Sequence, residues 1–254
     1  MKIFLAGAGG AVGRKLTPLL RAVGHTVIGT TRSADKADGV RALGAEPVVV
    51  DVFDAEALAR AVSAAAPEAI IHQLTDLPFA PGTPQYDEGI ARNVRLRIEG
   101  TANLVAAARA ANVKRMVAQS VAFAYAPAAG TRVESDPLNL GAEGSAGRSA
   151  QGAAALERAV LALPEGIVLR FGYFYGPGTW YDTPARTPSI HIDAAARATM
   201  QAVTKGKPGI YNIAEDDGAV SSAKARRELG FDPAFRVSER LVQKLQNFQS
   251  LSPR

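Results

Sequence analysis

Short apolar runs alternate with segments of helical periodicity along the first half of the chain. The apolar runs cover residues 3–6, 25–31, 47–51, 69–74 and 113–120, and we interpret them as β-strands. Helical patterns lie between them, at residues 15–20, 36–43, 54–65 and 86–110. This alternation predicts an α/β protein with a Rossmann-type doubly wound parallel sheet, in which ligands gather at the carboxyl ends of the strands. The run at 47–51 is apolar up to Asp51, so we expect that strand to be buried on both faces.

The second half predicts fewer elements. They are a helix over 191–203, a short strand over 210–213 and a helix ending at Gly230, capped by Ser221 or Ser222. The pattern at 238–248 is amphipathic, and we expect it to pack on the body of the protein, a neighbouring subunit in a homodimer being the alternative. We therefore divide the chain into a dinucleotide-binding domain, 1–170, and a mixed segment, 171–254, that completes the sheet and forms a small, reduced substrate lobe.

Composition excludes several classes of protein. The 254 residues hold 29 basic and 24 acidic side chains, a formal charge of +5, and the basic residues are scattered rather than grouped with aromatic ones. Nucleic-acid binding is therefore disfavoured. The chain has no cysteine, which excludes disulfides, a thiol nucleophile and thiolate metal sites. No apolar run is long enough to span a bilayer, and we expect a cytoplasmic protein with no membrane partner.

Glycines at positions 7, 10 and 13 follow the first apolar run and precede a helical pattern. Gly7 permits a sharp turn, and Gly10 lets backbone N–H groups approach a pyrophosphate. Gly13 lets the helix lie close to the strand. The phosphates then lie at a helix N-terminus, where free N–H groups and the helix dipole favour an anion. The motif predicts a dinucleotide site.

Arg32 and Ser33 follow the second predicted strand, where a dinucleotide fold faces the adenosine ribose. An acidic residue there would accept a hydrogen bond from the ribose 2′-hydroxyl and repel a 2′-phosphate. A guanidinium and a hydroxyl instead suit a phosphate, and one charge-assisted contact contributes about 1.5–3 kcal/mol. We therefore predict NADP rather than NAD. The alternative is that Arg32 is a solvated surface residue.

Other strand ends add candidates for cofactor contacts. Asp51 closes the third strand, where it could meet the adenine amino group, or simply begin the next turn. Residues 73–75 follow the fourth strand and are expected to pass beneath the ribose and phosphates. His72 lies inside that apolar strand, and a hydrogen-bonded core residue is the better interpretation than a catalytic one. The three histidines share no metal-ligand spacing, so we predict no metal site.

A set of motifs in this order resembles the extended short-chain dehydrogenase/reductase superfamily, the NAD(P)-dependent epimerase/dehydratase group. The motifs are Gly7 to Gly13, Asp51, Asn93 to Thr101 with Asn103-Leu104, Leu169 to Gly178, His191-Ile192-Asp193, Gly209 to Ile213 and Lys224 to Pro233. The resemblance implies that residues 173–178 lie near the nicotinamide and that the segment from Trp180 onward builds the substrate lobe. Together these arguments assign to the cofactor Gly7, Gly9, Gly10, Ala11, Val12, Gly13, Arg32, Ser33, Asp51, Val52, Gln73, Leu74, Thr75, Asn93, Gln119, Phe171 and Tyr173.

The reaction centre implied by the resemblance is missing from this chain. It consists of a serine or threonine after the fifth strand and a Tyr-x-x-x-Lys on the next helix, where the lysine lowers the pKa of the tyrosine. Counting back from Glu157 places Ser149 at the tyrosine position and Ala153 at the lysine position, and no lysine occurs between Lys114 and Lys205. Four hydroxyls remain as candidate proton donors, with core packing or cofactor contact as the alternative role: Ser120, Tyr125, Tyr173 and Tyr175.

Two functions are compatible with these residues. The first is an NADP-dependent oxidoreductase or epimerase-like enzyme acting on a small molecule, favoured by the proline-rich segment after Leu77 and the aromatic residues at 173–175. The second is a non-catalytic sensor of the cofactor, favoured by the missing tyrosine and lysine. The segments 180–189 and 216–220 are shorter than their counterparts in the family. Either the substrate lobe is reduced, or loops are absent from the sequence.

Overall fold

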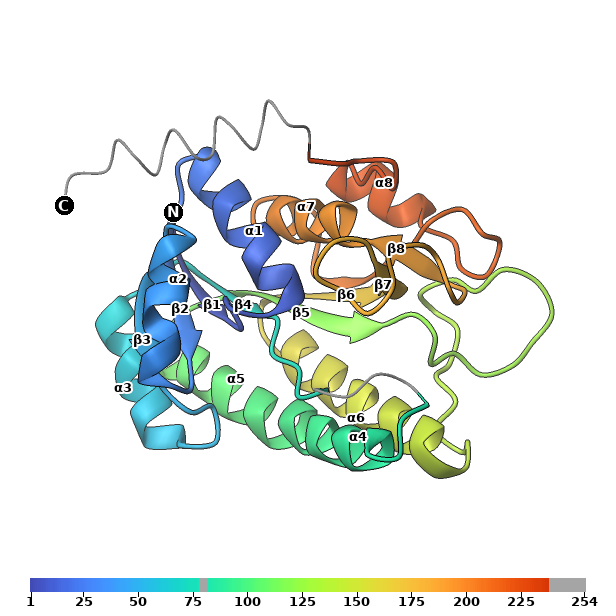
Figure 1. The fold of residues 1–254 in the computed structure, drawn as a ribbon, viewed down its shortest axis with the longest axis horizontal. Helices are drawn as coiled ribbons and strands as arrows, with labels where there is room; N and C mark the ends of the chain where they lie inside the picture. The colour runs from blue at the N-terminus through green and yellow to red at the C-terminus, as the bar shows by residue number, and fades with distance from the viewer. Residues whose placement is uncertain (78–81, 238–254) are drawn as a thin grey trace.

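A parallel sheet of seven strands forms the centre of the computed structural model, which describes residues 1–77 and 82–237 (Figure 1). The strand order is β3-β2-β1-β4-β5-β6-β9. The strands are β1 (Lys2–Ala6), β2 (Thr26–Thr31), β3 (Glu46–Val49), β4 (Ala69–His72), β5 (Arg115–Val121), β6 (Glu165–Phe171) and β9 (Gly209–Ile213). The order reverses between β1 and β4, so the carboxyl ends of these two strands flank the crevice in which such sheets bind ligands.

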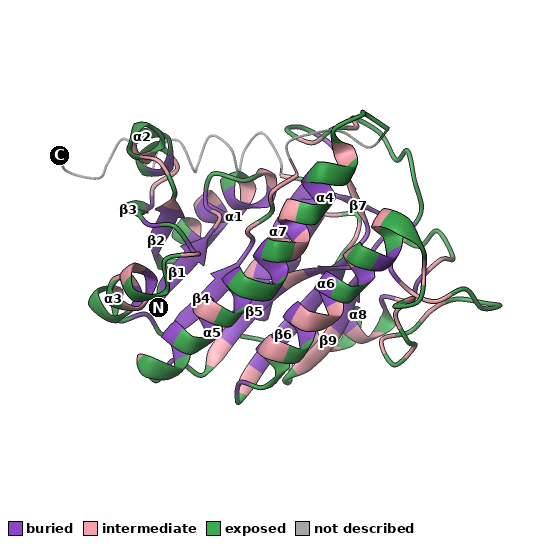
Figure 2. Cartoon of the chain, turned by 90° about the horizontal axis from the view of Figure 1, so that it is seen from below, coloured by how far each residue is buried: buried purple, intermediate pink, exposed green. Residues whose placement is uncertain are grey.

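Helices cover both faces of the sheet. The helical elements are α1 (Ala11–Ala22), η1 (Ala34–Lys36), α2 (Ala37–Ala42), α3 (Ala55–Ala65), α4 (Tyr86–Arg95), η2 (Leu96–Gly100), α5 (Thr101–Ala110), α6 (Gly144–Leu161), α7 (Ile192–Ala202) and α8 (Ala223–Leu229). Helices α1, α7 and α8 lie above the sheet in Figure 1, and α3 to α6 lie below it. Figure 2 shows the lower layer from outside, with α4 and α5 running beside α6.

The core follows the two-residue alternation of the strands. Ile3 and Leu5 of β1 point to the layer of α1 and α7, while Phe4 points to the layer of α3, α5 and α6. All three side chains are fully buried. A strand with apolar residues on both faces must be covered on both sides, which is why the sheet carries two helical layers.

The third strand differs from the prediction. We expected it to be buried on both faces, but β3 is the edge strand and pairs only with β2. The side chain of Val49 is 51% exposed. An apolar run therefore did not distinguish a central strand from an edge strand, because strand order depends on contacts that are remote in sequence.

The long helix predicted at 86–110 is present but is not uniform. Its middle turn, Leu96–Gly100, is π-helical, and α4 and α5 continue from it on either side. Such a turn changes which side chains face a neighbouring element and is frequent at functional sites. Here it turns Arg97 toward α6.

The last part of the described chain returns to the main sheet. The strand β9 pairs with β6, and a separate two-stranded sheet, β7 (Tyr173–Tyr175) with β8 (Ser189–His191), lies beside the end of β6. Asp54 caps α3 by accepting a hydrogen bond from the Ala57 amide. The predicted helix at 238–248, with Leu241, Val242, Leu245 and Phe248, lies outside the described residues. Within them, no helix combines the length and apolarity that crossing a bilayer requires.

Candidate functional site

The glycine-rich turn holds α1 close to the ends of β1 and β4. Gly7 has φ of +98°, and a Cβ built there would lie 2.8 Å from the backbone carbonyl of Gln73. A Cβ at Gly13 would lie 2.2 Å from the Gly7 carbonyl oxygen. Neither position tolerates a side chain. A Cβ built at Gly9, in contrast, would have no atom within 4 Å. The N-terminus of α1 consequently opens onto the cavity above the strand ends, where its free N–H groups favour an anion.

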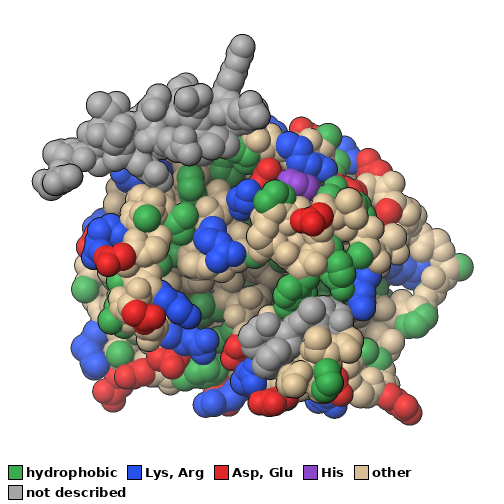
Figure 3. All heavy atoms as spheres, viewed as in Figure 1, with side chains coloured by type: hydrophobic (Ala, Val, Ile, Leu, Met, Phe, Trp, Pro, Cys, Tyr) green, Lys and Arg blue, Asp and Glu red, His purple; other side chains and the backbone are tan. Residues whose placement is uncertain are grey.

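The larger cavity lies over the carboxyl ends of β1, β2 and β4 and has a volume of about 620 Å³. In Figure 3, Lys and Arg side chains border a hollow on this face of the molecule. Of the predicted cofactor residues, nine line this cavity: Gly7, Gly9, Gly10, Arg32, Ser33, Val52, Gln73, Leu74 and Thr75. Its lining residues run from η1 to the segment after β4, a range of elements that a dinucleotide could contact.

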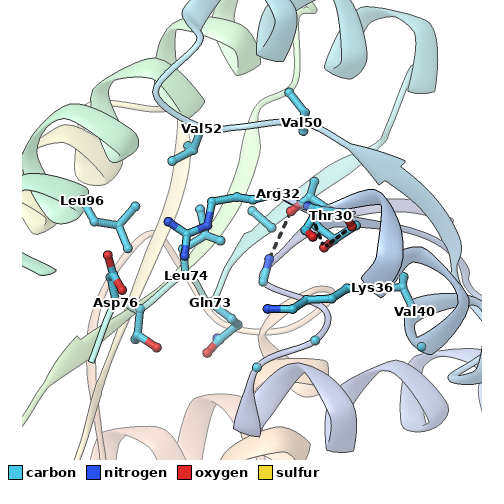
Figure 4. A pocket seen from close by; sticks show the side chains of 18 of the residues that line it. Thr30, Arg32, Lys36, Val40, Val50, Val52, Gln73, Leu74, Asp76 and Leu96 are labelled. Carbon is cyan, nitrogen blue, oxygen red and sulfur yellow. Dashed lines mark hydrogen bonds between the residues drawn. The ribbon is translucent and has the colours of Figure 1, made fainter. Parts of the chain in front are cut away.

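Two cationic side chains line the end of the larger cavity next to β2 and η1, which is the predicted adenosine end. Figure 4 shows the side chains of Arg32 and Lys36 directed into it. Neither makes a hydrogen bond or ion pair with another described residue, so both are free to bind an anion. The nearby carboxylate of Asp35 accepts a hydrogen bond from the Ser33 hydroxyl. Asp76, at the other end of the cavity, forms an ion pair with Arg92 at 3.4 Å.

Gln73 joins the larger cavity to a second one. Its side chain is 3% exposed, and neither its amide nitrogen nor its amide oxygen has a hydrogen-bond partner in the described structure. A buried amide without partners costs about 1–3 kcal/mol. Because Gln73 lines both cavities, this unsatisfied amide is an independent indication that a polar ligand crosses between them. The glycine turn, the free cations and this amide together fit a nicotinamide dinucleotide.

The second cavity, which we call the aromatic cavity, has a volume of about 330 Å³. Its walls include five aromatic side chains besides Phe171 and Phe174: Tyr86, Phe123, Tyr173, Trp180 and Tyr181. The rings of Phe123 and Tyr173 are stacked, with centroids 4.1 Å apart and planes 8° from parallel. Burial raises the pKa of Tyr86, and Tyr173 adds to the rise. These walls suit a flat, conjugated molecule.

Most of the remaining predicted site residues line the aromatic cavity, and three line neither cavity. The cavity is lined by Ala11, Val12, Thr75, Asn93, Gln119, Ser120, Phe171 and Tyr173. Gly13, Asp51 and Tyr125 line neither cavity. Gly13 contributes indirectly, because its missing side chain lets α1 lie close to the glycine turn. Asp51 is exposed, and its carboxylate accepts a hydrogen bond from the Phe53 amide at 3.0 Å.

The four candidate proton donors differ in what their hydroxyls contact. Ser120 donates to Glu157 at 2.7 Å, Tyr125 donates to Asn212 at 2.6 Å, and Tyr175 donates to Glu215 at 2.5 Å. The hydroxyl of Tyr173 has no hydrogen bond to another described residue, and its ring faces the Arg186 guanidinium at 5.5 Å. Only Ser120 and Tyr173 line the aromatic cavity, and of these only Tyr173 has an uncommitted hydroxyl.

The two positions of the missing Tyr-x-x-x-Lys pair lie on α6. Ser149 lines the aromatic cavity, and Ala153 is fully buried against Val121, Ala124 and Ala150. Arg97 reaches Ser149 from η2, and its Nη1 lies 3.3 Å from both the carbonyl oxygen and the hydroxyl of that residue. A serine hydroxyl therefore lies beside a buried guanidinium at the position where the resemblance predicts the family's tyrosine.

His72 has no access to either cavity. Its Nδ1 accepts a hydrogen bond from the Leu74 amide at 3.3 Å, so Nε2 carries the proton and donates to Thr101 Oγ1 at 2.9 Å. Burial, together with the charge of Arg97, lowers its pKa to about 4. It is a neutral, hydrogen-bonded core histidine, as predicted.

Several lining residues were not predicted. In the larger cavity these include Arg14 and Lys36, and in the aromatic cavity Tyr86, Arg97 and Tyr181. One signal was present in the sequence for Arg97, since it lies four residues after Asn93 on a predicted helix and such residues share a face. No signal of that kind marked Lys36, because its distance from Arg32 depends on the turn at η1.

Comparison with known proteins agrees with this geometry. A sequence model of a family described as NAD(P)H-binding matches residues 7–159. A 3-diazoavenalumate denitrifying reductase from a Streptomyces species is 37% identical over 270 residues, which cover 96% of this chain and 87% of that protein.

Solved structures share the fold at low sequence identity. UDP-glucose 4-epimerase from Thermotoga maritima, solved with UDP-glucose, superposes with a TM-score of 0.74 at 17% identity and covers 98% of this chain and 99% of its own. The epimerase of the same kind from Thermus thermophilus, solved with NAD, gives 0.74 at 18% identity and covers 99% and 100% of the two chains. At these identities the likeness concerns the fold alone.

Proposed function

Because this chain belongs to the family described as NAD(P)H-binding, we propose that it is an NADPH-dependent reductase that removes a diazo group from an aromatic compound as N₂. The comparisons support an NAD(P)-binding protein related to a reductase. The preference for NADPH and the diazo substrate are the proposal.

Arg32 and Lys36 support the preference for NADPH. Both side chains point into the predicted adenosine end of the larger cavity, and neither has a hydrogen-bond or ion-pair partner among the described residues (Figure 4). No acidic residue directly follows β2 to accept a hydrogen bond from a 2′-hydroxyl. A 2′-phosphate would give both cations a partner, at about 1.5–3 kcal/mol for each charge-assisted hydrogen bond.

The diazo reaction is inferred mainly from Ser149 and Ala153, which stand at the predicted positions of the family's tyrosine and lysine. A carbonyl that accepts a hydride becomes an alkoxide and needs a proton, which the family's tyrosine supplies. The described lining of the aromatic cavity contains no lysine, and although Arg97 lowers the pKa of Tyr86, burial outweighs it and raises that pKa. A reaction that needs no proton donor fits this site better.

Reductive loss of N₂ is such a reaction. The bound cofactor supplies a hydride. In the overall change an aryl diazonium exchanges its carbon–nitrogen bond for a carbon–hydrogen bond, and the electron pair of the hydride forms the new bond. N₂ leaves with the pair of the broken bond, and no proton is taken up. The protein has to hold the ring flat and exclude water, which the aromatic walls of the cavity suit.

The test is turnover with defined aryl diazonium compounds, for example a diazonium derivative of 4-hydroxycinnamate, in the presence of NADPH. We expect one NADPH to be oxidised for each N₂ released, and the ring to carry hydrogen at the former diazo carbon. Heat-denatured protein serves as the control for direct reduction by NADPH. UDP-glucose, the sugar nucleotide bound by one structural neighbour, should not be epimerised. Tight NADPH binding with no turnover of any diazonium compound would overturn the proposal and favour a cofactor sensor.

A further inference from the structure

Arg97 is a buried cation without a counterion of its own. Arg97 is 4% exposed. Burial lowers the pKa of its guanidinium to about 10, so it remains charged at neutral pH. Its hydrogen bonds within the described structure go to the carbonyl and hydroxyl oxygens of Ser149, which are both neutral and both reached by Nη1. The other nitrogens of the guanidinium have no partner there.

The carboxylate whose charge acts on Arg97 is that of Glu157, and it is committed to another arginine. Glu157 Oε1 accepts from Arg170 Nε at 2.8 Å and from Ser120 at 2.7 Å, and Glu157 Oε2 accepts from Arg170 Nη2 at 2.7 Å. This cluster therefore holds two buried guanidinium groups and one carboxylate. One positive charge remains, and it belongs to Arg97, which lines the aromatic cavity.

We propose that Arg97 and Ser149 form a binding subsite for an anionic oxygen on the planar aromatic substrate. The inference rests on the proposed function and names its substrate class, aromatic acids or phenolates. An uncompensated buried charge is strongly destabilising unless a ligand supplies the opposite charge. The rings of Tyr86, Phe123 and Tyr173 line the same cavity, so a flat acid can contact aromatic walls and the guanidinium together.

Ser149 gives the subsite its position relative to the reaction. It lies where the family's phenol meets the reacting group, so an anionic oxygen bound there is close to the reacting carbon. A ring phenolate next to the diazo carbon, or a carboxylate on a short conjugated arm, would satisfy this geometry. Both groups place a charged oxygen in conjugation with the ring. An experiment can tell whether the phenolate or the carboxylate is the group that binds.

Binding can be measured without turnover, because Trp180 is the single tryptophan of the chain and lines the aromatic cavity. We would titrate the NADP⁺-loaded protein with four ligands and follow tryptophan fluorescence. Cinnamate carries only the carboxylate and 4-nitrophenolate only the phenolate; methyl cinnamate and 4-nitroanisole are their neutral counterparts. We expect at least one anion to bind about 10- to 100-fold more tightly than its neutral counterpart, and the tighter anion identifies the source.

Variants then assign this charge preference to Arg97. Arg97→Met should reduce the preference to less than about two-fold, and Arg97→Lys should restore part of it. Arg186→Met is the matched control, since Arg186 faces the ring of Tyr173 but does not line the cavity, and it should leave the preference intact. Circular dichroism and NADPH affinity check that each variant is folded. If Arg97→Met does not fold, Arg97→Lys and the wild-type comparison still test the subsite.

The outcomes separate this inference from the proposed function. Equal binding of anions and neutral counterparts by the wild type would overturn the subsite, even if diazonium compounds are reduced. Unchanged preference in Arg97→Met would do the same. A preference that depends on Arg97, in a protein that reduces no diazonium compound, would support the subsite while the proposed reaction fails.

Discussion

The carboxylate of Glu157 on α6 accepts two hydrogen bonds from the guanidinium of Arg170 on β6, at 2.8 and 2.7 Å. Both side chains are more than nine-tenths buried. The same carboxylate holds the hydroxyl of Ser120 on β5, so one ionic pair joins a helix to two adjacent strands directly behind the aromatic cavity. This arrangement explains why Ser120, although it lines the cavity, is committed to the core.

Glu157→Gln should lower the free energy of unfolding by about 3 kcal/mol, because it leaves the charge of Arg170 buried without its counterion. Urea denaturation measures the change. The control is Glu99→Gln, which breaks an exposed pair with Arg95 at 2.9 Å and should cost less than about 1 kcal/mol. Similar losses in both variants would contradict a structural role for the buried pair.

Arg32→Ala should weaken NADPH binding about 10-fold or more and leave NADH binding nearly unchanged, since only NADPH carries the 2′-phosphate. Fluorescence titration with each cofactor provides both affinities. Arg41→Ala is a suitable control, because Arg41 lies on α2, pairs with Asp38 and does not line the larger cavity. Equal affinity of the wild type for NADPH and NADH would refute the assignment of Arg32.

Gln73→Met should have opposite effects on the free and the bound protein. Without cofactor it should raise the free energy of unfolding by about 1 kcal/mol, because it removes a buried amide that has no partner. With NADPH it should weaken binding, because the amide no longer contacts the ligand. Thermal unfolding with and without NADPH measures both effects. The exposed Gln151→Met serves as control, and a Gln73→Met variant that loses stability without any change in NADPH affinity would contradict the prediction.

Gly13→Ala should destabilise the protein and abolish tight cofactor binding, because the added Cβ would lie 2.2 Å from the Gly7 carbonyl oxygen and force α1 away from the turn. Gly9→Ala is the matched comparison in the same loop, as no atom lies within 4 Å of its Cβ position. Melting temperatures of the two cofactor-free variants should differ by several degrees. Equal melting temperatures would show that the close approach at Gly13 does not matter.

His72 should make the stability fall at acidic pH. Its pKa is about 4 in the folded protein and 6.5 when exposed, so the unfolded state binds the proton first as the pH falls. Its contribution is present above about pH 6.5 and is lost progressively toward pH 4, by about 3 kcal/mol in total. Urea denaturation from pH 7 to pH 4 should show this loss in the wild type and a smaller one in His72→Asn; parallel curves would contradict it.

Much of the fold could be predicted because it depends on local patterns. The apolar run of β1, the helical spacing in α3 and the aspartate that caps that helix each involve residues close in sequence. The edge position of β3 was missed although Pro47 lies within it, and a proline, which has no N–H to donate to a second neighbour, is typical of edge strands. Its exposure follows from having β2 as its only neighbour in the sheet.

The sequence by itself determined the alternating α/β architecture and the glycine turn at Gly7 to Gly13, whereas the loss of the usual tyrosine and lysine stays a prediction. Only the tertiary structure decided which side chains meet at the predicted positions of that pair. Arg97 and Ser149 are 52 residues apart in the chain and meet because a π-helical turn faces α6. Ser120 and Glu157 are 37 residues apart and meet because α6 packs against β5. Periodicity reports which side of its own element a residue occupies, whereas contacts between elements depend on how the whole chain packs.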